Sequence, residues 1–159
     1  MMKYSGILYN DFSAAPGVSL TFFTQGCPHR CPGCHNPETW DFDGGIEFTT
    51  EVLNDIKKGL RANGIERTLC IMGGEPLCPE NIFLTNLLIS EIKNEYPEQK
   101  IYVWTGYTYD KIKNPSNPQL KHILSTIDCL IDGPYIKELR DITLPMRGSS
   151  NQNIIYLKE

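Results

Sequence analysis

Short stretches rich in β-branched and aromatic residues alternate along this chain with segments of helical periodicity, and this alternation constrains the fold most strongly. The stretches occupy residues 18–24, 68–72, 101–104, 129–131 and 153–157, and their composition favours strands. Between several of them, apolar residues recur at helical spacing. Strands that alternate with helices predict right-handed βαβ units, so we expect an α/β fold with mostly parallel strands.

Three helices are expected between the strands. The first begins near Thr49 or Thr50, because either hydroxyl is able to cap it, and it ends by Gly64. The second spans roughly residues 81–96, and the third lies near 119–125. The second helix is expected to turn four apolar residues inward: Ile82, Phe83, Leu87 and Ile92.

Length and composition indicate one cytoplasmic domain, 1–159. The chain has 159 residues and 40% of them are apolar, which suits one domain but not two catalytic ones. A net charge of −4 argues against a nucleic-acid partner, which needs clustered Lys and Arg. No apolar run is long enough to span a membrane, and the first residues lack the apolar core of a secretion signal. In reducing cytoplasm, the six cysteines are expected to include metal ligands or a redox site.

Three cysteines lie within eight residues of a Pro- and Gly-rich loop after the predicted strand 18–24. Cys27, Cys31 and Cys34 have the spacing C-x3-C-x2-C, which allows all three thiols to reach one centre. Cys31 and Cys34 alone would suit a dithiol redox motif, but Cys27 then has no role. With His29 or His35 as a fourth ligand, the loop would form a structural zinc site. Otherwise we expect both histidines to be neutral, beside the ligands or in solvent.

The other three cysteines leave two further interpretations open. Cys70, Cys78 or Cys129 would supply the fourth thiolate of an electron-transfer cluster. These cysteines lie among apolar residues, however, where a free cysteine behaves as a small core residue. In the remaining interpretation, three thiolates hold a [4Fe–4S] cluster and leave one iron open, which is typical of a catalytic metal site.

A second motif follows the predicted strand 68–72. Gly73 and Gly74 allow a close backbone approach, and Glu75 is able to pair with an ammonium group. The cysteine triad followed by this GGE sequence resembles the radical S-adenosylmethionine enzymes. That resemblance implies that Cys27, Cys31 and Cys34 bind the cluster. It also implies six residues at the S-adenosylmethionine site: Gly33, Cys34, His35, Gly73, Gly74 and Glu75.

Within that family, the chain is most similar to the small activating enzymes of anaerobic ribonucleotide reductase. Gly33 stands where the family usually has an aromatic residue against the adenine, and Pro-Gly is common here in this subgroup. His35 stands where the subgroup often has Tyr, so an aromatic contact to the adenosine is only partly preserved. Four further segments resemble the subgroup: 34–40, 104–107, 131–135 and 147–152.

The resemblance implies an incomplete (β/α) barrel of the radical S-adenosylmethionine type. Eight βα units typically take about 250 residues, so a shorter chain is expected to form four to five parallel strands. Chemistry in such sheets gathers at the carboxyl ends of the strands. We therefore expect Cys34, Gly74, Trp104 and Asp132 at one rim of the barrel.

The implied activity is reductive cleavage of S-adenosylmethionine, which generates a glycyl radical on anaerobic ribonucleoside-triphosphate reductase. The reductase is then the protein substrate, a flavodoxin-like protein donates one electron, and the cluster and cofactor carry the chemistry without a catalytic side chain. Two alternatives remain. One is another small radical enzyme, such as an activase for pyruvate formate-lyase or a carboxy-deazaguanine synthase. The other is a zinc or iron–sulfur module without catalysis.

Several residues at loop and strand ends are further candidates for this site. Trp40 and Trp104 are as able to wall the active cavity as to pack in the core. Tyr107, Asp132 and Arg147 lie at turns on the expected active face, and the resemblance favours a functional role for them.

Overall fold

Seven strands form one sheet in the order β3-β1-β2-β4-β5-β6-β7 in the computed structural model, which describes residues 2–158. The strands are β1 (Lys3–Asp11), β2 (Ser19–Thr24), β3 (Ile46–Glu47), β4 (Thr68–Gly73), β5 (Ile101–Trp104), β6 (Cys129–Asp132) and β7 (Asn153–Tyr156). β2, β4, β5 and β6 are parallel neighbours. β1, β3 and β7 are antiparallel to their neighbours at the two edges. The predicted α/β class is confirmed.

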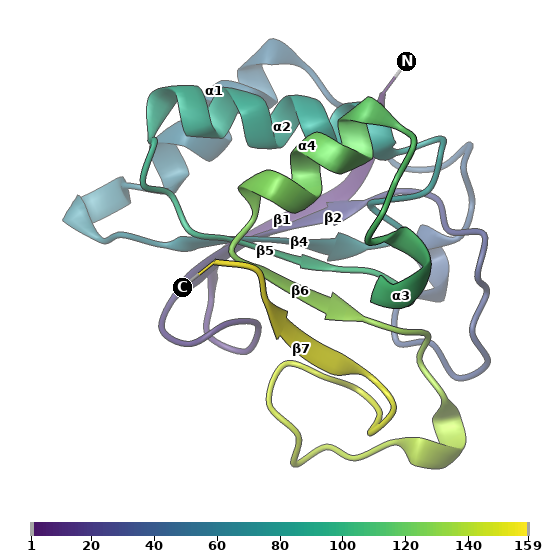
Figure 1. Cartoon of the computed structure of the whole chain (residues 1–159). Coiled ribbons are helices and arrows are strands. Elements are labelled where there is room, and N and C mark those ends of the chain that lie inside the picture. Colours follow the sequence, from purple (N-terminus) through teal and green to yellow (C-terminus); the bar gives the residue numbers. More distant parts are fainter. Residues whose placement is uncertain (1, 159) are drawn as a thin grey trace.

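The main helices cover one face of the sheet and leave the other face to loops (Figure 1). The α-helices are α1 (Thr50–Gly59), α2 (Ile82–Glu95), α3 (Tyr109–Ile112) and α4 (Pro118–Thr126). Short 3-10 turns occupy Pro37–Thr39, Ala62–Gly64 and Lys137–Leu139. The β1–β2 loop (residues 12–18) and the β6–β7 loop (133–152) lie on the face opposite α1, α2 and α4 (Figure 1).

Alternate residues of the strands point to two different apolar clusters, as the period of a strand requires. On β4, Leu69 and Ile71 join the large core under the helices. Cys70 instead joins a smaller cluster on the opposite face, with Ala14 and Ala15 of the β1–β2 loop. Partly buried residues complete this second cluster: Met72, Tyr102, Trp104 and Met146.

Two strand predictions require correction. β1 was not predicted, because its sequence shows no strict alternation and most of its residues are only half-buried or exposed. β7 occurs where a strand was expected, but it is antiparallel to β6. A parallel strand needs a crossover, usually a helix, whereas the β6–β7 loop contains only a 3-10 turn and the chain reverses. The parallel strands therefore number four.

The inward face of α2 also differs from the prediction. Leu84 and Leu88 are buried, whereas Phe83 is 56% exposed and Leu87 is half-buried. Residues 82–89 are apolar except for Thr85 and Asn86, so periodicity alone does not fix which side of this helix faces the core. Within residues 2–158, no helix has both the length and the apolar character needed to cross a membrane.

Candidate metal and cofactor site

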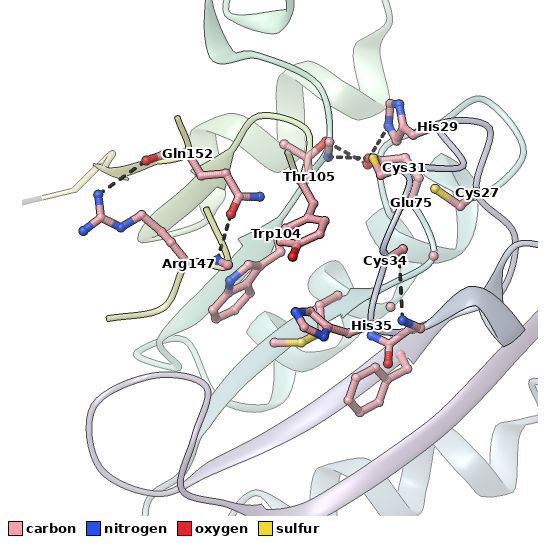
Figure 2. A pocket seen from close by; sticks show the side chains of 18 of the residues that line it. Cys27, His29, Cys31, Cys34, His35, Glu75, Trp104, Thr105, Arg147 and Gln152 are labelled. Atoms are coloured by element: carbon pink, nitrogen blue, oxygen red, sulfur yellow. Dashed lines mark hydrogen bonds and ion pairs between the residues drawn. The ribbon is translucent and has the colours of Figure 1, made fainter. Parts of the chain in front are cut away.

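A cavity of about 490 Å3 opens on the sheet face that the helices leave uncovered. Its volume lies in the range of about 300–1,000 Å3 typical of small-molecule sites. Residues at or after the carboxyl ends of β2, β4, β5 and β6 line it, as expected for a parallel sheet. Figure 2 shows the three clustered cysteines on one side of the cavity, and Trp104 and Arg147 on the other.

Most residues of the predicted site meet in this cavity. Its lining includes seven of them: Cys27, Cys31, Cys34, His35, Gly73, Gly74 and Glu75. Gly33 is exposed and is absent from the lining. Its φ of +78° lies in the left-handed region, which a glycine adopts without strain. The C-x3-C-x2-C and GGE motifs, some forty residues apart in sequence, thus share one concave surface.

Backbone hydrogen bonds hold the cysteine loop at its two ends. Gly26 N donates to Thr39 O (2.6 Å), and Cys27 N donates to Trp40 O (3.2 Å). Cys27 is buried, whereas Cys31 and Cys34 are half-buried, and all six thiols of the chain are free. Burial raises the pKa of the Cys27 thiol, so metal binding there has to release a proton.

The three thiols share the cavity without forming a preassembled metal site. Across residues 2–158, no three His, Cys, Asp or Glu side chains are gathered closely enough to hold an ion. His29, one of the two histidines considered as a fourth zinc ligand, is bound to Glu75 (2.7 Å), so a closed four-ligand zinc site would depend on His35 beside the three thiols. The three thiols suit an iron–sulfur cluster with one open iron better, because thiolates are the usual ligands of such clusters.

Glu75 is fully buried and joins the cysteine loop to the end of β5. Its Oε1 lies 2.7 Å from His29 Nε2 and 2.6 Å from Gly106 N. Its Oε2 accepts from Thr105 Oγ1 (2.8 Å) and Leu77 N (2.9 Å). An ionised Glu75 carboxylate only accepts hydrogen bonds, which makes His29 Nε2 the donor in that state. The Glu75 side chain is thus engaged by four protein donors.

Gly73 and Gly74 were expected to allow a close backbone approach. In the structure, Gly74 lies against the backbone of Gly26, in the cysteine loop. A Cβ on Gly74 would lie 2.3 Å from Gly26 O, which leaves no room for any side chain. Glu75 N donates to the same oxygen (2.8 Å). Asn81 Nδ2 also reaches Gly26 O (3.1 Å) and Glu75 O (2.9 Å). The GGE segment therefore fixes the position of the residue that precedes Cys27.

The segment 104–107 contacts both Glu75 and His29. Thr105 and Gly106 bind the Glu75 carboxylate, and a Cβ on Gly106 would lie 2.5 Å from the His29 ring. The Tyr107 ring packs edge-on against His29, with centroids 4.6 Å apart. Burial and the charge of Glu75 raise the pKa of Tyr107 to about 12, so its hydroxyl is neutral.

Comparisons with known proteins agree with these motifs. A family model described as a 4Fe-4S single cluster domain matches residues 14–155. A protein of Salmonella typhi named anaerobic ribonucleoside-triphosphate reductase-activating protein is 36% identical over 158 residues, covering 99% of this chain and all of the relative. The chain belongs to this family. Activating proteins of the same name from Escherichia coli K12 and phage T4 are 35% and 37% identical, over 99% and 96% of this chain and 100% and 93% of the relatives.

The three remaining cysteines of this family member are core residues. Cys70, Cys78 and Cys129 are fully buried and do not line the cavity. Burial raises the pKa of Cys70 and Cys78 to about 12 and that of Cys129 to about 11. Because none of these three lines the cavity, the thiols available to a cluster there are those of Cys27, Cys31 and Cys34.

The further candidates divide into two groups. Trp40, Trp104 and Arg147 line the cavity, and Trp104 Nε1 donates to Met146 O (2.8 Å). Asp132 and Tyr107 do not line it. Asp132 instead accepts from the backbone of Tyr109 (2.8 Å) and of Asn153 (3.1 Å), so it holds α3 and β7 in place.

One wall of the cavity was missed by the sequence analysis. It comes from β1 and the β1–β2 loop, through Leu8, Asp11, Ser13 and Ala14. Asp11 accepts from Thr21 Oγ1 (2.6 Å) and Ser13 N (2.9 Å). Burial alone would raise the pKa of Asp11, but these bonds outweigh it and leave the pKa lowered. A single Asp before a loop is too common to be a motif, and β1 itself was not predicted.

Proposed function

We propose that this chain is a radical S-adenosylmethionine enzyme that generates a glycyl radical on anaerobic ribonucleoside-triphosphate reductase. The observation that carries the proposal is the single cavity in which the cysteine triad meets the GGE segment. The names of the full-length relatives support the reductase as the protein substrate. The family model supports a single 4Fe-4S cluster.

Cys27, Cys31 and Cys34 would hold the cluster, because all three line the cavity and none is committed to a disulfide. When bound, the cluster and S-adenosylmethionine together supply the electron transfer and the radical that removes a hydrogen atom from a glycine Cα. We propose a flavodoxin-like protein as the electron donor. The apolar walls around Trp40, Met72 and Trp104 would exclude water and stray hydrogen donors from the reacting atoms.

The other predicted residues would hold S-adenosylmethionine. The backbone of Gly73 and Gly74 would bind the methionine amino group. Glu75 would contribute indirectly, by holding the cysteine loop against the end of β5. His35 would lie beside the adenosine, since its ring lines the cavity 5.3 Å from that of Tyr135. The turn at Gly33 would present Cys34 and His35 to the cofactor.

The proposed architecture is one radical S-adenosylmethionine domain, 1–159, with an incomplete (β/α) barrel. Four parallel strands whose carboxyl ends meet at one cavity are compatible with it. A barrel that stops after four parallel strands leaves an open side through which a macromolecule can enter. We propose that the protein acts in the cytoplasm, where its six free thiols would persist.

Electron paramagnetic resonance provides the test of this function. The chain is reconstituted anaerobically with iron and sulfide, then reduced and given S-adenosylmethionine and the reductase. We expect a doublet glycyl-radical signal on the reductase, and no signal from Cys31→Ala or with a reductase whose radical glycine is replaced by alanine. A colourless zinc protein would contradict the proposal. So would full-rate turnover of a small molecule without the reductase.

A further inference from the structure

The β1–β2 and β6–β7 loops meet over the face of the sheet that carries the cavity. Ala14 and Ala15 of the first loop and Met146 of the second belong to the same apolar cluster. Both loops also line the cavity, the first through Ser13 and Ala14 and the second through Leu144 and Met146 as well as other residues. Together they form one side of its entrance.

Each loop holds one large apolar side chain out in solvent. Phe12 is 78% exposed and Ile142 is 83% exposed, the two highest values among the large apolar side chains that the structure describes. Phe12 follows an irregularity in the β1–β2 register, between Leu8 and Asp11. Such irregularities redirect side chains near functional sites. Leu8 itself lines the cavity and is 50% exposed.

The loop segments that begin with these two side chains are uncharged, although Asp11 and Asp141 directly precede them. Residues 12–18 and 142–146 contain no Asp, Glu, Lys or Arg, although 21% of the whole chain is charged. The centres of protein interfaces are depleted of charged residues and rich in aromatic ones. Exposed apolar side chains on such segments favour a protein partner.

We infer that Phe12 and Ile142 form an apolar docking rim for the reductase, on the surface that surrounds its glycine-bearing loop. This inference rests on the proposed function, because that function requires a glycine of a folded protein to enter the cavity beside this rim. Contacts at the rim would determine the affinity for the reductase, whereas the cysteine triad and the GGE segment would bind the cluster and cofactor that generate the radical. The rim would close the entrance only when the partner is bound.

The test measures affinity and chemistry separately for Phe12→Ser, Ile142→Ser and the double variant, with the reductase encoded by the same genome as partner. Each single change is expected to raise the dissociation constant about tenfold, and the double change about a hundredfold, as for exposed anchors of an interface. Iron content and the slow, reductant-driven cleavage of S-adenosylmethionine without the reductase should match the unmodified chain.

Phe83→Ser is the matched control, because Phe83 is also a large exposed side chain but lies on α2, away from the two loops. It should leave the affinity unchanged. Unchanged affinity in the double variant, or an equal loss in Phe83→Ser, would overturn the docking rim. If the unmodified chain yields no glycyl radical, the proposed function fails, while the rim is still judged by the dissociation constants.

Discussion

His29 and Glu75 show how a side chain in the cysteine loop is tied to the GGE segment. The His29 side chain is largely buried, and its Nε2 lies 2.7 Å from Glu75 Oε1. Removing a hydrogen bond to a charged group typically costs about 1.5–3 kcal/mol. We expect His29→Ala to lower the free energy of unfolding of the cluster-free chain by that amount, and His29→Gln to recover part of it.

Urea unfolding measures this difference. His122→Ala is the control, since His122 is exposed on α4 and pairs only with Asn86. If both alanine variants lost the same free energy of unfolding, the bond between His29 and Glu75 would stabilise the chain no more than an exposed hydrogen bond does.

The six cysteines are expected to separate into two classes. Cys27, Cys31 and Cys34 line the cavity, so replacing any of them by alanine should abolish cluster assembly. Alanine at Cys70, Cys78 or Cys129 should leave the iron content near that of the unmodified chain. Iron and sulfide analysis of the six variants decides between three and four thiolate ligands, and loss of iron in Cys78→Ala alone would favour four.

At the residue scale, all predicted site residues except Gly33 line the cavity, but the sequence did not predict what they contact. The triad and GGE were recognisable because metal and cofactor chemistry restricts both residue type and spacing. The bond between His29 and Glu75 was not predictable, since it joins residues 46 positions apart through the packing of two loops. Neither residue type nor spacing encodes such a contact.

Among the elements, α1 offers a direct test of capping. Val52 N donates to Thr49 Oγ1 (3.3 Å), so Thr49, not Thr50, is the cap. Loss of an N-cap hydroxyl typically costs about 1 kcal/mol, or about 2–4 °C in a domain of this size. Thr49→Ala should lower the thermal midpoint by this amount, and Thr50→Ala should not. Equal shifts would assign the effect to helix propensity instead.

The stability of the folded chain should depend on pH through Asp11, which lies where β1 meets the β1–β2 loop. Its pKa is lowered in the folded chain, so the folded state binds fewer protons there than the unfolded one. The stabilisation is complete well above the ordinary value of 3.8 and disappears as the pH falls through the folded pKa. Asp11→Asn should cost about 1 kcal/mol at neutral pH.

Urea unfolding of both chains, at neutral pH and again below pH 3.8, provides the measurement for Asp11. The difference between them should shrink on acidification. A constant difference would mean that the Asp11 carboxylate is no better stabilised in the folded chain than in the unfolded one.

The elements that were predicted correctly are those with a local signal. Strands β2, β4, β5 and β6 lie in buried apolar stretches, and Pro97 follows the end of α2. β1 was missed because most of its residues are half-buried or exposed and show no strict alternation. Phe83 was misplaced because a nearly continuous apolar run fits more than one helical face.

The molecule as a whole is expected to stay folded without its cluster. The two apolar clusters contain no residue of the cysteine loop between Gln25 and Trp40, so the metal does not organise the core as it does in a zinc finger. Chelation should leave the far-ultraviolet circular dichroism unchanged and lower the thermal midpoint by a few degrees. Unfolding of the chelated chain would show instead that the loop stabilises the sheet.

Apart from β3, which pairs with β1, the strands from β2 onward are added to the sheet in sequence order: β2, β4, β5, β6 and β7. A ribosome delivering about 5–20 residues per second therefore supplies each strand with a partner that already exists. The three thiols leave the ribosome early, whereas the wall formed by residues 133–152 is made last. The nascent chain thus exposes its cysteines to stray metals and oxidants until synthesis is nearly complete.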